Sequence, residues 1–363
     1  MKKILLLTTG GTIASVQSEN GLIPMDIHNK FKDILADNET KLDIEEVFVL
    51  DSSNIQPEEW KVLATKIYEK MPDYDGIIVT HGTDTMAYTT SMISLMVQNP
   101  SLPIVFTGSQ LPISHPLSDA YDNLKCALEM AKSGYKGIFI AFDRKVILGS
   151  RAVKVRTSGF KAFESINLTP FATASSNGLV ISPIYLNEHN QKKPLLNTNI
   201  ETNVFLLKLT PTTNPNIIDL LISSGTKGIV IEAYGAGGMS FIRRDFVSKI
   251  DLAIKNNVPV VLCSQCLYES SNFNIYEVGT KALKTGAIEA LDMTTESAVC
   301  KLMYALGQTN DINEIKSIFQ TPIANEIQSQ KKGLWRNNQS SINKNGVSNQ
   351  FKIWKETPFC CII

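Results

Sequence analysis

The segment Gly76–Thr85, which reads GIIVTHGTDT, shows how this chain is built. Its first four residues, Gly76–Val79, form a short apolar run, and polar residues with one glycine follow. Apolar residues then recur at helical spacing over Thr85–Val97. A strand, a polar turn and a helix in immediate succession are typical of a sheet of parallel strands that is covered by helices on both faces.

The same unit recurs along the chain. Short apolar strands alternate with helices in the first half, and the alternation resumes after a polar stretch. We therefore expect two α/β domains, a larger one at 1–186 and a smaller one at 204–330, with 187–203 as the linker. The expected strands are Lys3–Leu7, Glu46–Leu50, Gly76–Val79, Leu102–Phe106, Gly137–Ala141, Val204–Leu209, Gly228–Glu232 and Val258–Cys263, and the expected helices are Pro57–Lys70, Thr85–Val97, Ser118–Ser133, Pro215–Ser223, Asp245–Lys255 and Thr295–Leu306.

Composition and charge exclude several classes of function. The chain has 363 residues, of which 43% are hydrophobic and 19% charged, as in globular proteins. Its 35 Lys and Arg residues balance 35 Asp and Glu residues, so nothing attracts it to a phosphate backbone and we expect no nucleic-acid partner. It has no apolar run of about 18 residues, and the apolar start at Ile4–Leu7 is shorter than the core of a signal peptide. We therefore expect a cytoplasmic protein without a membrane partner.

Cysteine and histidine are too few for a disulfide framework or a metal site. Six cysteines in a chain of this length form no framework, and Cys126 and Cys300 lie in apolar helical patterns where burial is predicted. Cys263 and Cys266 form a lone C-x-x-C, for which redox or metal chemistry is less favoured than burial. None of the four histidines has the spacing of metal ligands, so we expect neither a metal nor another cofactor.

The end of the chain differs in composition from the rest. Residues 331–363 are rich in Asn, Ser, Gln and Lys, and we predict that they are disordered. The last four residues, Cys360–Ile363, fit a loose C-a-a-X prenylation pattern. Four residues match such a pattern by chance fairly often, so an incidental ending is favoured over lipidation.

Four of the expected strands end in turns that are rich in Thr, Ser, Asp and Gly. In a parallel sheet these turns meet at the carboxyl edge, where ligands bind. Their glycines allow a close approach of the backbone, and free N–H groups at a helix start suit an anion or a developing oxyanion. One such turn is an ordinary helix cap, but four together indicate a site. The turns are Thr8–Thr12, Asp51–Asn54, Thr80–Thr85 and Thr107–Gln110.

Missing motifs narrow the chemistry of this site. The turn at Gly10–Thr12 is not a G-x-G-x-x-G fingerprint, and the chain has neither a G-x-x-x-x-G-K-[ST] loop nor a G-x-S-x-G elbow. Nucleotide binding and Ser-His-Asp hydrolysis are therefore disfavoured. A hydroxyl nucleophile that works without histidine remains, and a desolvated Lys154 is a candidate proton partner, the alternative being a solvated surface lysine. The residues alone do not say which threonine would be the nucleophile.

Two of the turns resemble the signatures of the bacterial-type L-asparaginase family. They are Thr9–Ser15, which reads TGGTIAS, and His81–Tyr88, which reads HGTDTMAY. The resemblance extends over residues 3–325 and is strongest to the cytoplasmic, type I branch. Supporting segments in the family order are Asp51–Ser53, Thr107–Gln110, Arg151–Lys154, Tyr234–Gly235 and Asp292–Thr294.

The resemblance implies an asparaginase-like fold, a homotetramer or homodimer, and hydrolysis of L-asparagine to L-aspartate and ammonia. Thr12 would attack the side-chain amide carbon, ammonia would leave a β-aspartyl ester on Thr12, and water would hydrolyse the ester. Thr83 would act on a proton with the help of Lys154, while Asp84 would hold Lys154 and bind the α-ammonium of the substrate. The implied substrate-binding residues are Gly11, Asp51, Ser52, Ser53, Gly82, Thr83 and Asp84, with Ser52 at the α-carboxylate.

The chain departs from the family pattern at three positions. Leu22 stands where many members carry a loop tyrosine, and the segment 13–50 contains no tyrosine, so we do not expect activation of Thr12 by such a residue. Gly238 stands where an asparagine is frequent. Glu232 replaces an arginine that binds an allosteric asparagine in some type I members, although Cys266 matches their cysteine. Because a glutamate repels a carboxylate, we expect weak or absent allosteric activation.

Two other functions stay open. A related amidotransferase subunit releases ammonia for tRNA-bound glutamate, but such subunits carry an extra N-terminal domain, whereas here the first signature begins at Thr9. A two-lobed amino-acid-binding protein would use the same cleft, but binding alone would not need Lys154 beside two threonines. Ammonia release by the purified protein separates a hydrolase from both.

Overall fold

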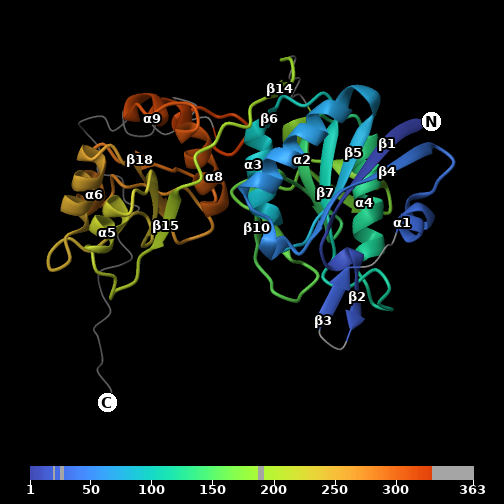
Figure 1. Cartoon of the computed structure of the whole chain (residues 1–363), viewed down its shortest axis with the longest axis horizontal. Coiled ribbons are helices and arrows are strands. Elements are labelled where there is room, and N and C mark those ends of the chain that lie inside the picture. Colours follow the sequence, from blue (N-terminus) through green and yellow to red (C-terminus); the bar gives the residue numbers. More distant parts are fainter. Residues whose placement is uncertain (19–20, 25–27, 187–191, 329–363) are drawn as a thin grey trace, which may run out of the picture. The chain divides into compact units, whose positions relative to one another are not determined.

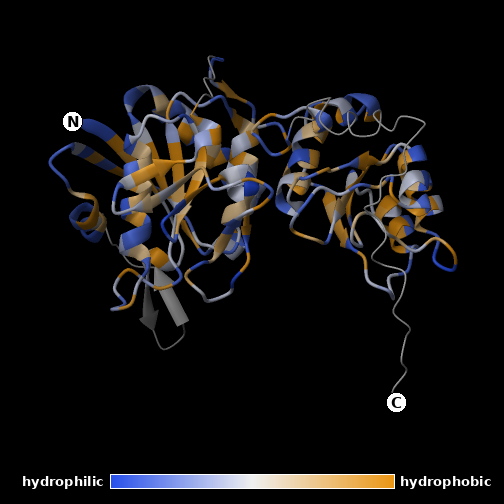
Figure 2. Cartoon of the chain, turned by 180° about the vertical axis from the view of Figure 1, so that it is seen from behind, coloured by the Kyte–Doolittle hydropathy of each residue, from blue (hydrophilic) through white to orange (hydrophobic). Residues whose placement is uncertain are grey.

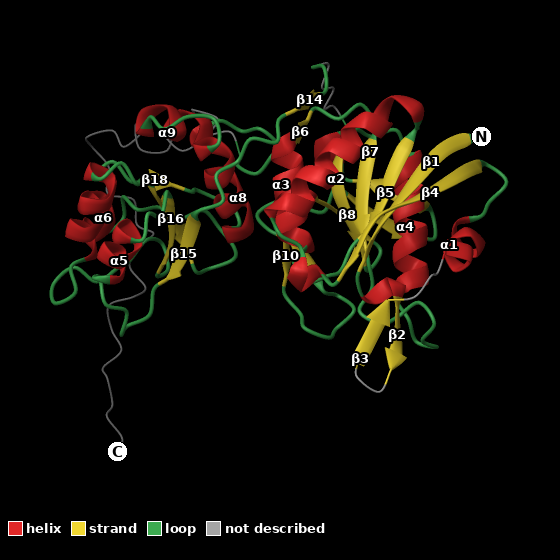
Figure 3. Ribbon diagram, in the orientation of Figure 1, coloured by secondary structure: helices red, strands yellow, loops and turns green. Residues whose placement is uncertain are grey.

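The computed structural model describes residues 1–18, 21–24, 28–186 and 192–328, which form two main sheets with their helices (Figures 1 and 3). The prediction of a larger N-terminal and a smaller C-terminal α/β part is confirmed. The predicted tail, with its terminal cysteines, and residues 187–191 of the predicted linker lie outside the described residues. The bounds of the two domains stay predictions.

The larger sheet has eight strands in the order β13-β12-β9-β8-β7-β5-β1-β4. The five neighbouring strands from β8 to β4 run parallel, as predicted. Three further strands extend the sheet with antiparallel pairing, which the sequence analysis did not predict. The strands are β1 (Lys2–Gly10), β4 (Thr40–Leu50), β5 (Gly76–Thr80), β7 (Pro103–Thr107), β8 (Gly137–Phe142), β9 (Lys145–Leu148), β12 (Ala172–Ser175) and β13 (Gly178–Ile181).

Helices cover both faces of this sheet because successive side chains of a strand point to opposite sides. In β1, Leu5 and Leu7 belong to the core formed with α2 and α3, whereas Ile4 and Leu6 belong to the core formed with α1 and α4. Figure 2 shows the hydrophobic residues concentrated on the central strands. The helices are α1 (His28–Leu35), α2 (Pro57–Lys70), α3 (Met86–Met96) and α4 (Ala120–Lys132).

Helix α2 has the predicted bounds because its sequence specifies both its start and its buried face. Pro57 is in the first turn, where backbone N–H groups have no partner within the helix, so a residue without an N–H group costs no hydrogen bond. The carboxylate of Glu59 accepts a hydrogen bond from the N–H of Gln56 at 2.8 Å, as in a capping box. The apolar residues at helical spacing are buried, namely Trp60, Leu63, Ala64 and Ile67.

The smaller sheet has four parallel strands in the order β15-β16-β17-β18. One face packs against α5, α6 and α7, and the other packs against α8 and α9. Helix α8 has the predicted bounds. The elements are β15 (Val204–Lys208), α5 (Ile217–Ser223), β16 (Gly228–Ala233), α6 (Phe246–Lys255), β17 (Val260–Ser264), α7 (Glu277–Lys284), β18 (Ile288–Glu289), α8 (Thr295–Leu306) and α9 (Ile312–Gln320).

The largest error in a strand bound concerns β4, which begins six residues before the predicted start at Glu46. This strand lies at an edge of the sheet, where its first half carries charges instead of an apolar run. Asp43 pairs with Lys3, and Glu45 pairs with Lys70. Further elements that were not predicted include α1, α7 and α9, together with the short pairs β2 (Ser15–Ser18) with β3 (Gly21–Pro24), β6 (Val97–Gln98) with β14 (Leu195–Leu196), and β10 (Ala152–Lys154) with β11 (Phe163–Ser165).

The strand order creates a topological switch point between β1 and β5. From β1 the chain passes to β4 on one side, and then to β5, β7 and β8 on the other side. Ligands of open α/β sheets bind at the carboxyl ends of the strands beside such a point. The turns that follow β1 and β5 are therefore where the topology favours a site.

Burial on a central strand should govern stability. Ile78 of β5 is fully buried, so Ile78→Ala should lower the free energy of unfolding by about 2–5 kcal/mol through lost packing and a cavity. The matched control is Val62→Ala on α2, where the side chain is 53% exposed and the change should stay within about 0.5 kcal/mol. Denaturant unfolding followed by circular dichroism measures both. Equal effects would contradict the placement of Ile78 in the core.

Candidate active site

A contact between two glycine backbones joins the turns after β1 and β5. Gly11 has a φ of 82°, and a Cβ atom at this position would lie 2.5 Å from the backbone nitrogen of Gly82. No side chain fits there. Because Thr12 follows Gly11 and Thr83 follows Gly82, the contact brings the two threonine-bearing turns together.

The turn after β4 packs against the same two turns. A Cβ atom at Gly10 would lie 2.5 Å from the carbonyl oxygen of Leu50, and the N–H of Gly11 donates to that oxygen at 3.0 Å. A Cβ atom at Gly82 would lie 2.6 Å from Oγ of Ser52. Three of the four predicted turns therefore meet, with glycine where each approach is closest.

The residues after β4 are tied to the start of α3. Ser52 is 2% exposed. Its Oγ accepts a hydrogen bond from the N–H of Asp84 at 3.3 Å. Its carbonyl oxygen accepts a hydrogen bond from Oγ1 of Thr85 at 2.8 Å. Asp51 accepts hydrogen bonds from the N–H of Ser53 at 2.8 Å and from its hydroxyl at 2.5 Å. The hydroxyl bond in particular lowers the pKa of the Asp51 carboxyl below its usual value, so this group is ionised at neutral pH.

Lys154 reaches the turn after β5 from the short strand β10. Its Nζ donates to Oγ1 of Thr83 at 2.8 Å and to Oδ1 of Asp84 at 2.5 Å. The side chain of Lys154 is 17% exposed, whereas that of Asp84 is 62% exposed. The ammonium group therefore bridges a buried hydroxyl and an accessible carboxylate, and its role as a proton partner stays a prediction.

Gln110 belongs to this cluster although it was not among the predicted site residues. Oγ1 of Thr83 donates to Oε1 of Gln110 at 3.2 Å. Nε2 of Gln110 donates to the carbonyl oxygens of Thr157 and Gly159, each at 3.2 Å. The glutamine thus links Thr83 to the loop that follows β10. Its place in the fourth polar turn was the signal from which it could have been found.

His81 lies beside this cluster but is shut off from solvent. Its ring is fully buried, and burial lowers the pKa of the imidazole to about 4. The ring is therefore neutral at pH 7, and Nδ1 lies 2.7 Å from the carbonyl oxygen of Gly82, to which it donates. A ring in this position supports the turn after β5 and exchanges no proton with solvent.

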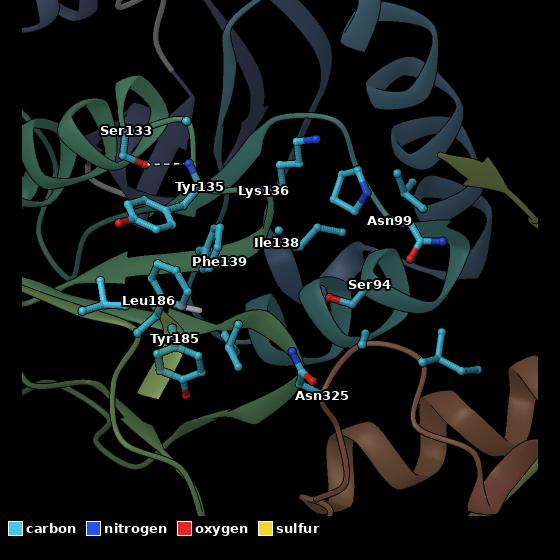
Figure 4. Close-up of a pocket in the computed structure, with 18 residues that line it drawn as sticks. Ser94, Asn99, Ser133, Tyr135, Lys136, Ile138, Phe139, Tyr185, Leu186 and Asn325 are labelled. Atoms are coloured by element: carbon cyan, nitrogen blue, oxygen red, sulfur yellow. Dashed lines mark hydrogen bonds between the residues drawn. The ribbon is translucent and has the colours of Figure 1, made fainter. Parts of the chain in front are cut away.

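A cavity of about 620 Å³ lies at the opposite edge of the sheet from these turns (Figure 4). It opens beside the start of β8 and the C-terminal ends of α3 and α4, away from the turns described above. Aromatic rings form much of its wall, and it contains no lysine–hydroxyl–carboxylate set. We therefore do not take this cavity as the candidate active site. Labelled lining residues are Ser94, Asn99, Ser133, Tyr135, Lys136, Ile138, Phe139, Tyr185, Leu186 and Asn325.

The described cysteines are free thiols. Cys126 and Cys300 are buried, as predicted. In the C-x-x-C pair Cys263 is buried, whereas the expectation of burial is wrong for Cys266, which is exposed. Burial raises the pKa of the Cys263 thiol to about 12, which removes its reactivity at neutral pH. Within residues 1–18, 21–24, 28–186 and 192–328, no group of three or more His, Cys, Asp or Glu side chains could hold a metal ion. None of the helices in these ranges is long and apolar enough to cross a membrane.

Comparison with known families accounts for both halves of the chain. The family profile described as Asparaginase, N-terminal, matches residues 3–183. The profile described as Glutaminase/Asparaginase C-terminal domain matches residues 203–319.

Individual relatives agree with these profiles. An L-asparaginase from Thermococcus kodakarensis is 40% identical over 328 residues, which cover 90% of this chain and 99% of that protein. The solved structure of the thermostable L-asparaginase from that organism has a TM-score of 0.85 at 39% identity. This match covers 90% of this chain and 99% of that chain. A glutamyl-tRNA(Gln) amidotransferase subunit from Methanosphaera stadtmanae is 37% identical, covering 90% of this chain and 77% of that protein. L-asparaginase I from Vibrio cholerae has a TM-score of 0.81 at 27% identity, covering 90% of this chain and 99% of that chain. The two matching profiles and these relatives show that the chain belongs to the asparaginase family of amidohydrolases.

Proposed function

We propose that this protein hydrolyses L-asparagine to L-aspartate and ammonia, with Thr12 as nucleophile and a covalent β-aspartyl intermediate. The observation that carries the proposal is the hydrogen bond of 2.8 Å from Nζ of Lys154 to Oγ1 of Thr83, in a turn that packs against the turn of Thr12. A lysine on a buried hydroxyl is an arrangement for proton transfer. A protein that only binds an amino acid would not need it.

The reaction would proceed in two halves on the two threonines. Oγ of Thr12 attacks the amide carbon, and backbone N–H groups of the interlocked turns, including that of Thr83, hold the developing oxyanion. The hydroxyl proton of Thr12 passes through Thr83, which is bonded to Lys154, to the departing nitrogen, and the C–N bond breaks as ammonia leaves. Water then attacks the ester carbon, one of its protons returns through Thr83 to Oγ1 of Thr12 as the ester bond breaks, and L-aspartate is released.

The remaining groups would bind the two charged ends of the substrate. The exposed carboxylate of Asp84 faces the α-ammonium and also holds Lys154. Oγ of Ser52 accepts the N–H of Asp84, so its hydroxyl hydrogen can point toward the α-carboxylate. Asp51 and Ser53 shape the pocket beside Ser52, and the glycines at positions 11 and 82 leave room for the substrate chain.

Loss of the nucleophile should abolish the reaction. Thr12→Ala should release no ammonia from L-asparagine above the uncatalysed rate, because no ester can form, while substrate binding and folding persist. Coupled detection of ammonia and isothermal titration calorimetry measure the two properties. Thr65→Ala, on a helix outside the cluster, is the matched control and should keep full activity. Turnover by Thr12→Ala would remove this residue from the role of nucleophile.

Loss of the proton partners should slow the chemical step more than it weakens binding. Thr83→Ala and Lys154→Met should each lower kcat by about 10²- to 10⁴-fold, the range for removal of a general acid or base. Steady-state kinetics with L-asparagine measures kcat and KM separately. The control Lys61→Met lies on the exposed side of α2 and should change neither constant. A near-normal kcat in Thr83→Ala would exclude it from proton transfer.

The second candidate function is that of an amidotransferase component, because several relatives are subunits of glutamyl-tRNA(Gln) amidotransferases. The two functions differ in what the isolated protein can do. Ammonia release from free L-asparagine by the purified protein alone supports the hydrolase. Turnover that appears only with a partner protein and aminoacylated tRNA supports the amidotransferase.

We further propose that free asparagine does not activate the enzyme allosterically. The carboxylate of Glu232 accepts a hydrogen bond from Oγ1 of Thr295 at 2.7 Å and pairs with Nζ of Lys208 at 3.5 Å. Its side chain is 13% exposed, so it places negative charge where another carboxylate would have to bind. Initial rates should therefore follow a hyperbola in L-asparagine concentration. A sigmoidal curve would contradict this.

The remaining proposals concern organisation and location. We propose that the protein acts in the cytoplasm as a homotetramer or homodimer. A probable cytoplasmic L-asparaginase from Campylobacter jejuni has a similar solved structure, with a TM-score of 0.75 at 25% identity over 89% of this chain and 100% of that chain, which supports the location. We also propose domain bounds at 1–186 and 204–330, in keeping with family profiles that end at residue 183 and begin at residue 203.

A further inference from the structure

Lys154 is the last residue of β10, and β10 is not part of the larger sheet. Within the part of the chain that the structure describes, it pairs with β11 alone, in a two-stranded sheet where Lys154 lies opposite Phe163. Residues 149–151 connect β10 to β9 of the larger sheet, so the place of the lysine depends on these preceding residues as well as on the pairing with β11.

Those preceding residues, Gly149–Arg151, form a buried turn of 3₁₀ helix that is held from two sides. On one side, Oγ1 of Thr90 on α3 lies 3.0 Å from the carbonyl oxygen of Gly149 and 2.9 Å from that of Met86, so its one proton is shared between them. On the other side, Oγ of Ser297 on α8 donates to the carbonyl oxygen of Ser150 at 2.5 Å. The turn that leads into β10 is thus hydrogen-bonded to α3 of the larger α/β part and to α8 of the smaller one.

Arg151 adds three hydrogen bonds to these connections. Its side chain is fully buried, and Nε donates to the carbonyl oxygen of Asn325 at 2.6 Å. One terminal nitrogen donates to the carbonyl oxygen of Asp292 at 2.8 Å and to its carboxylate at 3.0 Å. The planar guanidinium joins two separate segments of the C-terminal part to the strand of Lys154 in one fixed geometry.

The segment 321–328, which receives Arg151, is itself fixed by a buried ion pair. Lys301 of α8 pairs with Glu326, and both side chains are almost completely buried. Glu326 accepts the N–H of Ala324 at 2.6 Å, and this turn presents the Ala324 carbonyl oxygen to Oγ of Ser150 at 2.7 Å. The N–H of Gln328 donates to the Asp292 carboxylate at 3.1 Å. The two groups that bind the 3₁₀ turn, the Ala324 carbonyl oxygen and the Asp292 carboxylate, are therefore each held by further hydrogen bonds.

We propose that Arg151 is a positioning residue for the reaction: with Asp292 and the segment 321–328, it holds β10 so that Nζ of Lys154 stays on Thr83. The inference rests on the proposed function of Lys154. A lysine side chain has four flexible bonds and cannot fix its own tip, so the backbone beneath it must be fixed instead. A displacement of about 1 Å at a reacting group can lower a rate about 10²-fold.

The test must separate positioning from stability, because Arg151→Met alone leaves a buried carboxylate unpaired and can unfold the protein. The double variant Arg151→Met with Asp292→Asn avoids the unpaired charge and keeps an acceptor for Gln328. We expect a thermal midpoint near that of the wild type, a kcat about 10- to 100-fold lower, and a KM within about twofold. A buried ion pair that served stability alone would lower the midpoint and leave kcat unchanged, and this result would overturn the proposal.

A cycle with Lys154→Met shows whether the effect passes through the lysine. In a Lys154→Met background, the double change at Arg151 and Asp292 should lower kcat no further, because the group that it positions is gone. An equal further loss would overturn the proposal. Full activity of Lys154→Met by itself would instead refute the proposed role of Lys154, so the two failures are distinguishable.

A milder pair of variants decides the question if the double variant does not fold. Ser150→Ala removes only the bond to Ala324, whereas Ser182→Ala removes a similar bond to the carbonyl oxygen of Pro170. Ser150→Ala should lower kcat severalfold with KM unchanged, and Ser182→Ala should leave both constants at wild-type values. Equal kcat values for the two variants would overturn the proposal.

Discussion

The arrangement of the site depends on the contact between the backbones of Gly11 and Gly82. A Cβ atom on Gly11 would come within 2.5 Å of the neighbouring chain, so any side chain there would push the turns after β1 and β5 apart. The positive φ of Gly11 is also a conformation that other residues adopt only with strain. Thr12 and Thr83 each follow one of these glycines. The separation of Thr12 and Thr83, whose hydroxyl groups we propose to react, therefore depends on the absence of side chains at Gly11 and Gly82.

Lys154, which we propose as the proton partner of Thr83, is held in a different way. Lys154 comes from a short two-stranded sheet, and its support is a set of buried charges and hydroxyl groups from the C-terminal part. Buried ion pairs seldom stabilise a protein more than well-packed apolar side chains would. The burial of Arg151 with Asp292, and of Lys301 with Glu326, is better explained by the fixed directions of their hydrogen bonds. In this view, the smaller α/β part contributes to the chemistry by making one strand of the larger part rigid.

Sequence patterns predicted those helices and strands that are specified by residues within or next to them. Helices α2 and α8 have the predicted bounds because capping residues and apolar spacing lie within the helices themselves. The first half of β4 was missed because an edge strand carries charged residues that pair with neighbours such as Lys70. The antiparallel strands β9, β12 and β13 were missed because each has only four residues, too few for a clear pattern. Hydrogen bonds to a neighbouring strand identify them instead. Gln110 was overlooked for a similar reason, since only its contact with Thr83 distinguishes it from a turn residue.

By itself, the sequence determined a parallel α/β core and the polar turns at its carboxyl edge, because periodicity and turn chemistry depend on residues that are close along the chain. Only the tertiary structure decided that Lys154 lies on Thr83 and that Arg151 is buried against Asn325. These pairs are 71 and 174 positions apart in the sequence. Whether a lysine is a surface charge or a proton partner depends on what surrounds its ammonium group. That environment exists only once the two α/β parts have packed around the strand that carries it.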